Sequence, residues 1–109
     1  MQFLRTMKHH KPLFDLGKTI ITKDGMAYIL QHEVEITEIL KEHQKGDWSH
    51  MSKWYQNANK EAAKTNGYII STHSYKNEAI CIITDRSQRV TTISRSYEVV
   101  MIPIFAPEH

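Results

Sequence analysis

The sequence has little of what marks several large protein classes. One cysteine, four glycines and three prolines occur in 109 residues, so the chain holds no internal disulfide and lacks the composition of fibrous or flexible chains. No apolar run approaches the about 20 residues that cross a bilayer, and no apolar core of a signal peptide follows Met1. We therefore expect a cytoplasmic protein in a reducing compartment, with no membrane contact.

The chain also has no large excess of positive or negative charge. Fourteen Lys and Arg against twelve Asp and Glu leave a net charge of +2, which permits an anionic partner but not the basic coat of many nucleic-acid-binding tails. Seven histidines add positive charge below about pH 6.5. The length and the 40% hydrophobic content fit one core, so we expect a flexible arm over residues 1–12 and a single α+β domain over 13–109.

In the first two thirds of the chain, apolar residues recur at the spacing of a helix. This spacing predicts helices over Lys23–His32 and Glu33–Gln44 and one long helix between Ser49 and Gly67. Thr22 is a good N-cap for the first helix, and Gly46 is a natural end for the second. For the long helix the expected caps are Asp47 or Ser49.

The last third alternates as strands do. It predicts an antiparallel β-meander over Tyr68–Tyr75, Ala79–Thr84 and Arg89–Ser94. The stretch Ala79–Ile83 is apolar on both faces, which predicts a central strand. We expect the long helix to cover one of its faces, and the N-terminal helices or a partner subunit to cover the other.

Two further stretches bring the expected sheet to three or four strands. The stretch Leu13–Ile21 is either a strand or an extended segment packed on the core. The apolar run Val99–Phe105 is a candidate fourth strand, and Pro103 favours an edge position for it. An exposed apolar edge favours pairing with a second copy, so this strand predicts a homodimer.

Three stretches resemble a known family. They are Phe14–Thr19, His43 with Gly46-Asp47-Trp48, and Ile83–Ser87 running on to Thr91-Thr92-Ile93. Together they resemble the small "plasmid-related proteins" of bacterial mobile elements, over roughly Phe14 to Glu98. The chain departs from that pattern after Glu98, where an apolar tail replaces the family's usual ending. The resemblance implies a mobile-element setting and no defined reaction.

One candidate site is that of a metal-independent ribonuclease, by analogy with the order of elements in barnase-type and RelE-type enzymes. Such cleavage needs a base, an acid and cations around the phosphorus. The candidate base is a histidine, the cations are arginines, and the hydrogen-bond donors are hydroxyls: His43, His73, Arg86, Arg89, Thr91, Thr92 and Ser71. The alternative is that the arginines are solvated turn residues and the threonines are sheet formers.

A second candidate is a binding surface around the start of the long helix. Aromatic side chains among cations stack on bases and contact phosphate, and they are also frequent in protein interfaces. The candidate residues are Lys45, Trp48, His50, Lys53 and Trp54, beside Tyr55. The alternative is that Trp54 and Tyr55 belong to the core and only Trp48 is partly exposed.

No metal or cofactor is predicted. His43, Asp47 and His50 have a conceivable ligand spacing, but Asp47 is more simply a helix cap. The leading hypothesis is a mobile-element accessory protein that binds another protein or nucleic acid. The alternative is a small metal-independent, toxin-like ribonuclease.

Overall fold

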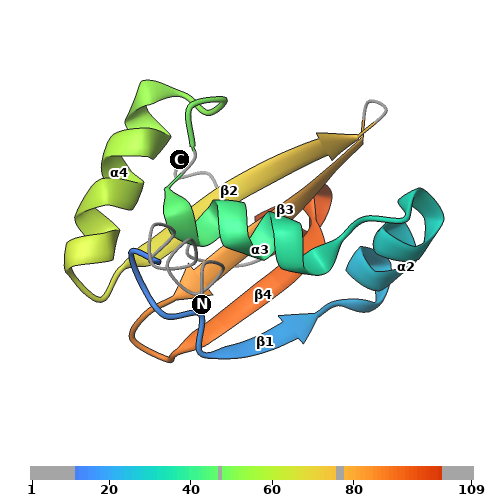
Figure 1. Ribbon diagram of the computed structural model, residues 1–109, viewed down its shortest axis with the longest axis horizontal. Helices are drawn as coiled ribbons and strands as arrows, with labels where there is room; N and C mark the ends of the chain where they lie inside the picture. The colour runs from blue at the N-terminus through green and yellow to red at the C-terminus, as the bar shows by residue number, and fades with distance from the viewer. Residues whose placement is uncertain (1–11, 47, 76–77, 102–109) are drawn as a thin grey trace, which may run out of the picture.

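The fold is α+β, as predicted, with helices around a four-stranded sheet (Figure 1). The computed structural model describes residues 12–46, 48–75 and 78–101. Within these ranges no helix is long and apolar enough to cross a membrane. The elements in chain order are β1 (Lys18–Ile21), α2 (Lys23–His32), α3 (Ile36–Lys45), α4 (Lys53–Lys64), β2 (Tyr68–Tyr75), β3 (Glu78–Asp85), β4 (Val90–Arg95) and the 3₁₀ helix η1 (Ser96–Met101).

Local capping chemistry sets the helix ends. The Thr22 hydroxyl accepts the Gly25 N–H at 3.0 Å, so α2 begins where the sequence predicts. Gly46 ends α3 with a φ of 82°, a conformation in which a side chain is strained. The long helix α4 begins later than predicted, because Ser52 caps it by accepting the Tyr55 N–H at 3.3 Å.

The strand order is β1-β4-β3-β2. The predicted antiparallel meander is confirmed for β2, β3 and β4. The sheet is mixed, however, because β1 pairs with β4 in parallel. The fourth strand thus comes from the stretch before α2. The strand predicted over 99–105 is wrong for its described part, since Ser96–Met101 is a 3₁₀ helix; residues 102–105 lie outside the described ranges, and dimerisation through them stays a prediction.

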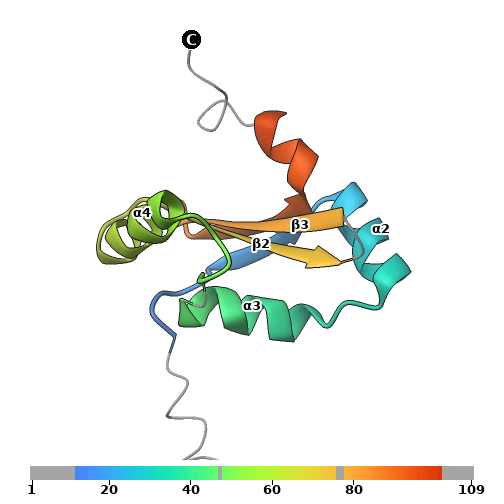
Figure 2. The same cartoon turned by 90° about the horizontal axis from the view of Figure 1, so that it is seen from above.

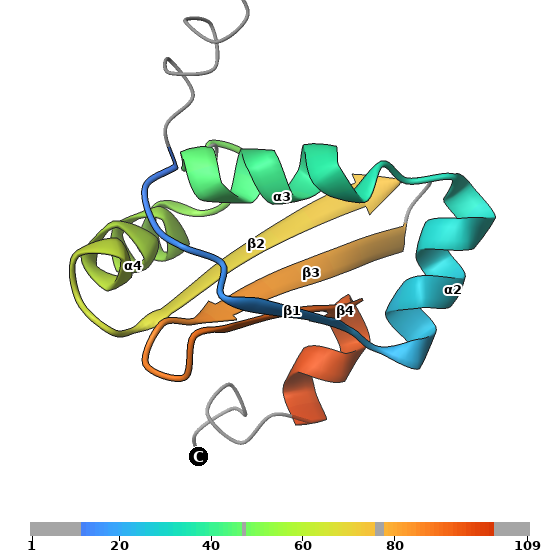
Figure 3. The ribbon, with the colours of Figure 1, turned by 60° about the horizontal axis from the view of Figure 1, so that its bottom comes forward.

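The central strand β3 is buried as expected, but the long helix does not cover its face. Ile80 and Ile82 pack with residues of α2 and α3 such as Tyr28 and Ile39. Figure 2 shows α3 on one side of the sheet and η1 on the other. The helix α4 instead runs beside β2 (Figure 3). The single cysteine, Cys81, is buried in β3, and burial raises its pKa to about 12.

One buried side chain on α4 explains this placement. The Asn59 amide donates to the Ile70 carbonyl at 2.7 Å, and its oxygen accepts the Ile70 N–H at 3.0 Å. Both groups of Ile70 belong to the side of β2 that has no neighbouring strand. Asn59 is 1% exposed and takes the place of a neighbouring strand at Ile70, so these two backbone groups are not available to another chain.

We expect Asn59→Ala to destabilise the protein by about 2–4 kcal/mol, because it leaves a buried donor and a buried acceptor of Ile70 without partners. Urea unfolding followed by circular dichroism measures the loss. The matched control is Asn57→Ala, an exposed asparagine of the same helix, which should change the free energy of unfolding by less than about 0.5 kcal/mol. Equal effects of the two changes would contradict this role of Asn59.

Candidate functional site

The structure separates the two predicted arginines from the predicted histidines. Arg86 and Arg89 lie in the turn between β3 and β4, beside the start of β2. His73 lies farther along β2, roughly 17 Å away at about 3.4 Å per strand residue. Thr91 is fully buried, and Thr92 is the next residue of the same strand, on the opposite face. A phosphate held by the arginines would therefore lie far from this histidine.

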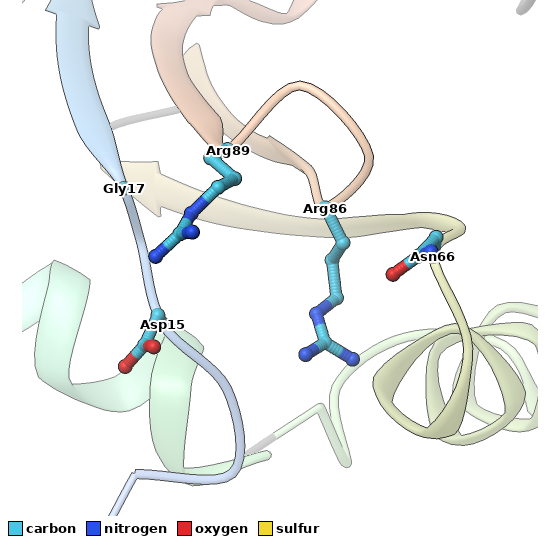
Figure 4. Close-up of a pocket in the computed structure, with 5 residues that line it drawn as sticks. All are labelled: Asp15, Gly17, Asn66, Arg86 and Arg89. Carbon is cyan, nitrogen blue, oxygen red and sulfur yellow. The ribbon is translucent and has the colours of Figure 1, made fainter.

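The arginines line a small pocket of about 210 Å³ with Asp15, Gly17 and Asn66 (Figure 4). Arg86 has an architectural role there. Its guanidinium donates to the carbonyl of Thr65 at 2.8 Å, to that of Ala62 at 3.3 Å and also to that of Ala63, so it caps the end of α4. A helix C-terminus favours cations, which agrees with the position of Arg86, and the Asp15 carboxylate adds one negative charge to the lining.

Gly17 lets the chain approach the second arginine. Its φ is +68°, and a Cβ at this position would lie 2.0 Å from the Arg89 carbonyl oxygen. The next residue, Lys18, donates its N–H to that same oxygen at 2.9 Å. The backbone of Arg89 is thus part of the joint between β1 and β4, while its side chain is exposed.

His43 is completely buried between α3 and the sheet. Its Nδ1 lies 2.6 Å from the Ser71 hydroxyl and its Nε2 lies 2.9 Å from the Thr84 hydroxyl. Burial, together with the nearby His73, lowers the pKa of His43 to about 3. The ring is therefore neutral at physiological pH, and its geometry favours a structural role over proton exchange with a substrate.

Two threonines continue the hydrogen bonds on one side of His43. The hydroxyls of Thr84 and Thr91 are 2.7 Å apart, on adjacent paired residues of β3 and β4. The Thr91 hydroxyl then donates to the Leu16 carbonyl at 2.7 Å. These contacts join α3, two strands and the segment before β1.

On the other side of His43 the hydrogen bonds reach the surface. The Ser71 hydroxyl lies 3.2 Å from Nε2 of His73. The Nδ1 of His73 lies 3.5 Å from the Glu42 carboxylate on α3. The full series, which we call the relay, consists of Glu42, His73, Ser71, His43, Thr84, Thr91 and the Leu16 carbonyl.

The outer end of the relay opens into a groove of about 400 Å³. We call it the histidine groove; its lining residues are Glu42, His50, Thr72, His73 and Ser74. The two imidazole rings have their centroids 6.0 Å apart. Nε2 of His50 lies 2.6 Å from the Thr72 carbonyl oxygen and must carry a hydrogen, because a carbonyl only accepts.

Ser71, His73 and Glu42 occur in the order of a hydroxyl, an imidazole and a carboxylate, as in a nucleophilic triad. A nucleophile has to reach its substrate, however, and Ser71 has no exposed surface. Its hydroxyl is also 2.6 Å from the second imidazole, that of His43. The arrangement therefore favours a positioning role for Ser71.

The candidate binding residues are divided between core and surface. Trp48 is 3% exposed and packs with Phe14 and Ile69, the reverse of the alternative in which it alone is partly exposed. Trp54 is 70% exposed and Tyr55 39%. Their rings meet edge to face with centroids 5.0 Å apart; we call them the aromatic pair. Lys45, His50 and Lys53 are also exposed.

Sequence reasoning missed Glu42 and Thr84 as partners in the site. Glu42 has the polar spacing of a solvent-facing residue, and nothing local indicates the histidine opposite it. A signal did exist for His43, which continues the spacing of Ile36, Ile39 and Leu40 along the buried side of α3. Among the described residues no three acidic, histidine or cysteine side chains form a possible metal site; Asp47 lies outside those residues.

We expect the low pKa of His43 to make stability depend on pH. As the pH falls below about 6.5, the unfolded histidine takes up a proton that the folded one refuses down to about pH 3, which costs up to about 1.4 kcal/mol per pH unit. His43→Gln removes this titration, so the stability advantage of the natural protein over the variant should narrow by about 1–3 kcal/mol between pH 6 and pH 4.

Urea unfolding at a series of pH values measures this difference. His50→Gln, which removes an exposed histidine, controls for the loss of an imidazole as such. A gap between natural protein and His43→Gln that stays constant with pH would contradict the neutral, buried state of His43.

Comparison with known proteins identifies no relative of this chain. No protein-family model matches the chain, and no curated protein or solved structure matches it. The resemblance to plasmid-related proteins therefore stays a prediction from the residues quoted for it. Function has to be argued from the histidine groove and the aromatic pair.

Proposed function

We propose that the protein binds single-stranded nucleic acid through the aromatic pair and the cations around it. The observation that carries this proposal is the exposure of Trp54, 70%, and its edge-to-face contact with Tyr55 at the start of α4. A large aromatic ring costs free energy when it faces water. Bases offer such a ring a stacking partner whatever their sequence.

The charges beside the aromatic pair support a polyanionic ligand. Lys53 precedes Trp54 directly, and His50 lies two residues before Ser52, the N-cap of the helix. Lys45 is exposed at the end of α3. These side chains offer separate contacts for phosphates, and such contacts make affinity depend on salt. The mobile-element resemblance gives the proposal a setting, that of an accessory protein acting on nucleic acid.

We expect Trp54→Ala to weaken binding of a single-stranded oligonucleotide roughly tenfold, because stacking of one base contributes about 1–3 kcal/mol. Because a substitution of Trp54 removes the tryptophan that responds, the fluorescence anisotropy of a dye-labelled oligonucleotide measures the affinity of every variant, and tryptophan emission is followed in the natural protein. The two tryptophans separate the signals, since buried Trp48 should keep its emission while exposed Trp54 is quenched by the oligonucleotide.

Leu30→Ala is the matched control, since Leu30 is also 70% exposed but lies on α2, and it should leave the affinity unchanged. Trp54→Phe should retain most of the binding. Tryptophan emission that does not respond to DNA or RNA at low salt would contradict the proposal and favour a protein partner for the aromatic pair.

The second candidate function is RNA cleavage, and the observation that favours it is the pair of imidazoles in the histidine groove. One ring would take the proton of the 2′-hydroxyl as its oxygen attacks phosphorus, and the other would protonate the departing 5′-oxygen. The described lining of the groove contains no Lys or Arg, so only the imidazoles could offset the additional negative charge of the pentavalent phosphorus in the transition state. Binding is therefore the better-supported function.

If the groove cleaves RNA, the purified protein should degrade total RNA in the presence of EDTA and leave 2′,3′-cyclic phosphate ends. His50→Ala and His73→Ala should each abolish this activity, whereas Trp54→Ala should only weaken it through binding. Intact RNA after incubation with the natural protein would eliminate this second candidate and leave the binding proposal unaffected.

A further inference from the structure

We infer that the histidine groove is a phosphate-binding subsite whose contact atom is the Nδ1–H of His73, and that the Glu42 carboxylate occupies this subsite in the free protein. The inference rests on the proposed function for the source of the phosphate, which is the bound strand. It follows from the direction in which hydrogen bonds are donated along the relay.

That direction is fixed at the buried end. The Thr91 hydroxyl has one hydrogen and gives it to the Leu16 carbonyl, since a carbonyl can only accept. In the contact between Thr91 and Thr84, Thr84 must therefore be the donor. The hydrogen of Thr84 is then used as well, so Thr84 accepts from Nε2–H of His43.

The same count of hydrogens applies to the residues that follow toward the surface. A neutral His43 with its hydrogen on Nε2 has a lone pair on Nδ1, and the neutral form agrees with its pKa of about 3. Ser71 therefore donates to His43 across 2.6 Å. With its only hydrogen used, Ser71 accepts from Nε2–H of His73. Each step has one solution, because a hydroxyl has one hydrogen and a neutral imidazole has one.

In His73, which lines the groove, Nε2 therefore carries a hydrogen. A second proton can go only to Nδ1, the atom 3.5 Å from the Glu42 carboxylate. With that proton the ring is an imidazolium that forms an ion pair with the carboxylate; without it, a lone pair faces the carboxylate oxygen. The contact has the chemistry of an imidazolium holding an anionic oxygen.

Glu42 is the group that a phosphate would replace. Its side chain is 48% exposed, whereas that of His73 is 14% exposed and fixed by the relay. The carboxylate can therefore turn into water while the ring stays in place. A phosphate oxygen can then accept from Nδ1–H, with Thr72, Ser74 and His50 along the groove.

The groups that face His73 determine how this contact depends on pH. Among the described residues these groups include Glu42 and His43 from α3 and His50 from the segment before α4. His43 stays neutral, so the charge at His73 changes against one carboxylate and one exposed imidazole. A phosphate oxygen needs the second hydrogen on Nδ1, so this contact requires the imidazolium form of His73.

Inorganic phosphate tests the subsite without any nucleic acid. In ¹⁵N spectra of the imidazoles at pH 6.0, phosphate should shift Nδ1 of His73 and leave His43 unchanged with its hydrogen on Nε2. Glu42→Gln should tighten phosphate binding about threefold, in the range expected for losing one exposed ion-pair competitor. Glu38→Gln is the matched control, since Glu38 is an exposed carboxylate one turn away on α3, and should bind as the natural protein does.

The outcomes separate this inference from the proposed function. A hydrogen on Nδ1 of His43 would overturn the direction of the relay. Phosphate shifts at His73 that are absent, or equal affinities in Glu42→Gln and Glu38→Gln, would overturn the subsite, even if Trp54→Ala still weakens oligonucleotide binding. If oligonucleotides do not bind but phosphate still shifts Nδ1 of His73, the proposed function is wrong. The groove then binds phosphate from another source.

Discussion

A neutral imidazole sealed between α3 and the sheet is the constraint on which the architecture depends. His43 has no exposed surface, so both its nitrogens need partners inside the protein. Ser71 and Thr84 supply them from two neighbouring strands. A shift of α3 along the sheet would break both contacts at once, and this fixes the position of the helix more sharply than apolar packing alone would.

Other polar residues have the same architectural use. Asn59 takes the place of a neighbouring strand at Ile70 of β2, and Arg86 caps the end of α4 with its guanidinium. Each forms hydrogen bonds with backbone groups that would otherwise have no partner. In a small domain, where apolar burial alone is limited, such residues hold elements in place that have few other contacts.

Some polar and aromatic residues hold the fold together and others are exposed, and the exposed ones are the candidates for function. The arginine turn and the buried threonines are used by the fold, whereas the segment between α3 and α4 and the first turn of α4 present Trp54, Lys53 and His50 to water. The histidine groove lies beside that segment, because His50 belongs to it and contacts β2. The structure thus leaves an exposed aromatic pair in the first turn of α4 and an exposed imidazole in the segment before it.

The sequence by itself determined most of the elements. Alternation located β2, β3 and β4, helical spacing located α2 and α3, and Thr22 and Gly46 set helix ends, because these signals depend on neighbours in the chain. Only the tertiary structure decided which polar residues are buried. The pairing of β1 with β4 and the contacts of Asn59 with β2 and of Glu42 with His73 join residues far apart in sequence, and no local pattern encodes such a meeting. The same reason separates Trp48 from Trp54: both are aromatic and near one helix start, and packing against Phe14 and Ile69 buried one and left the other in water.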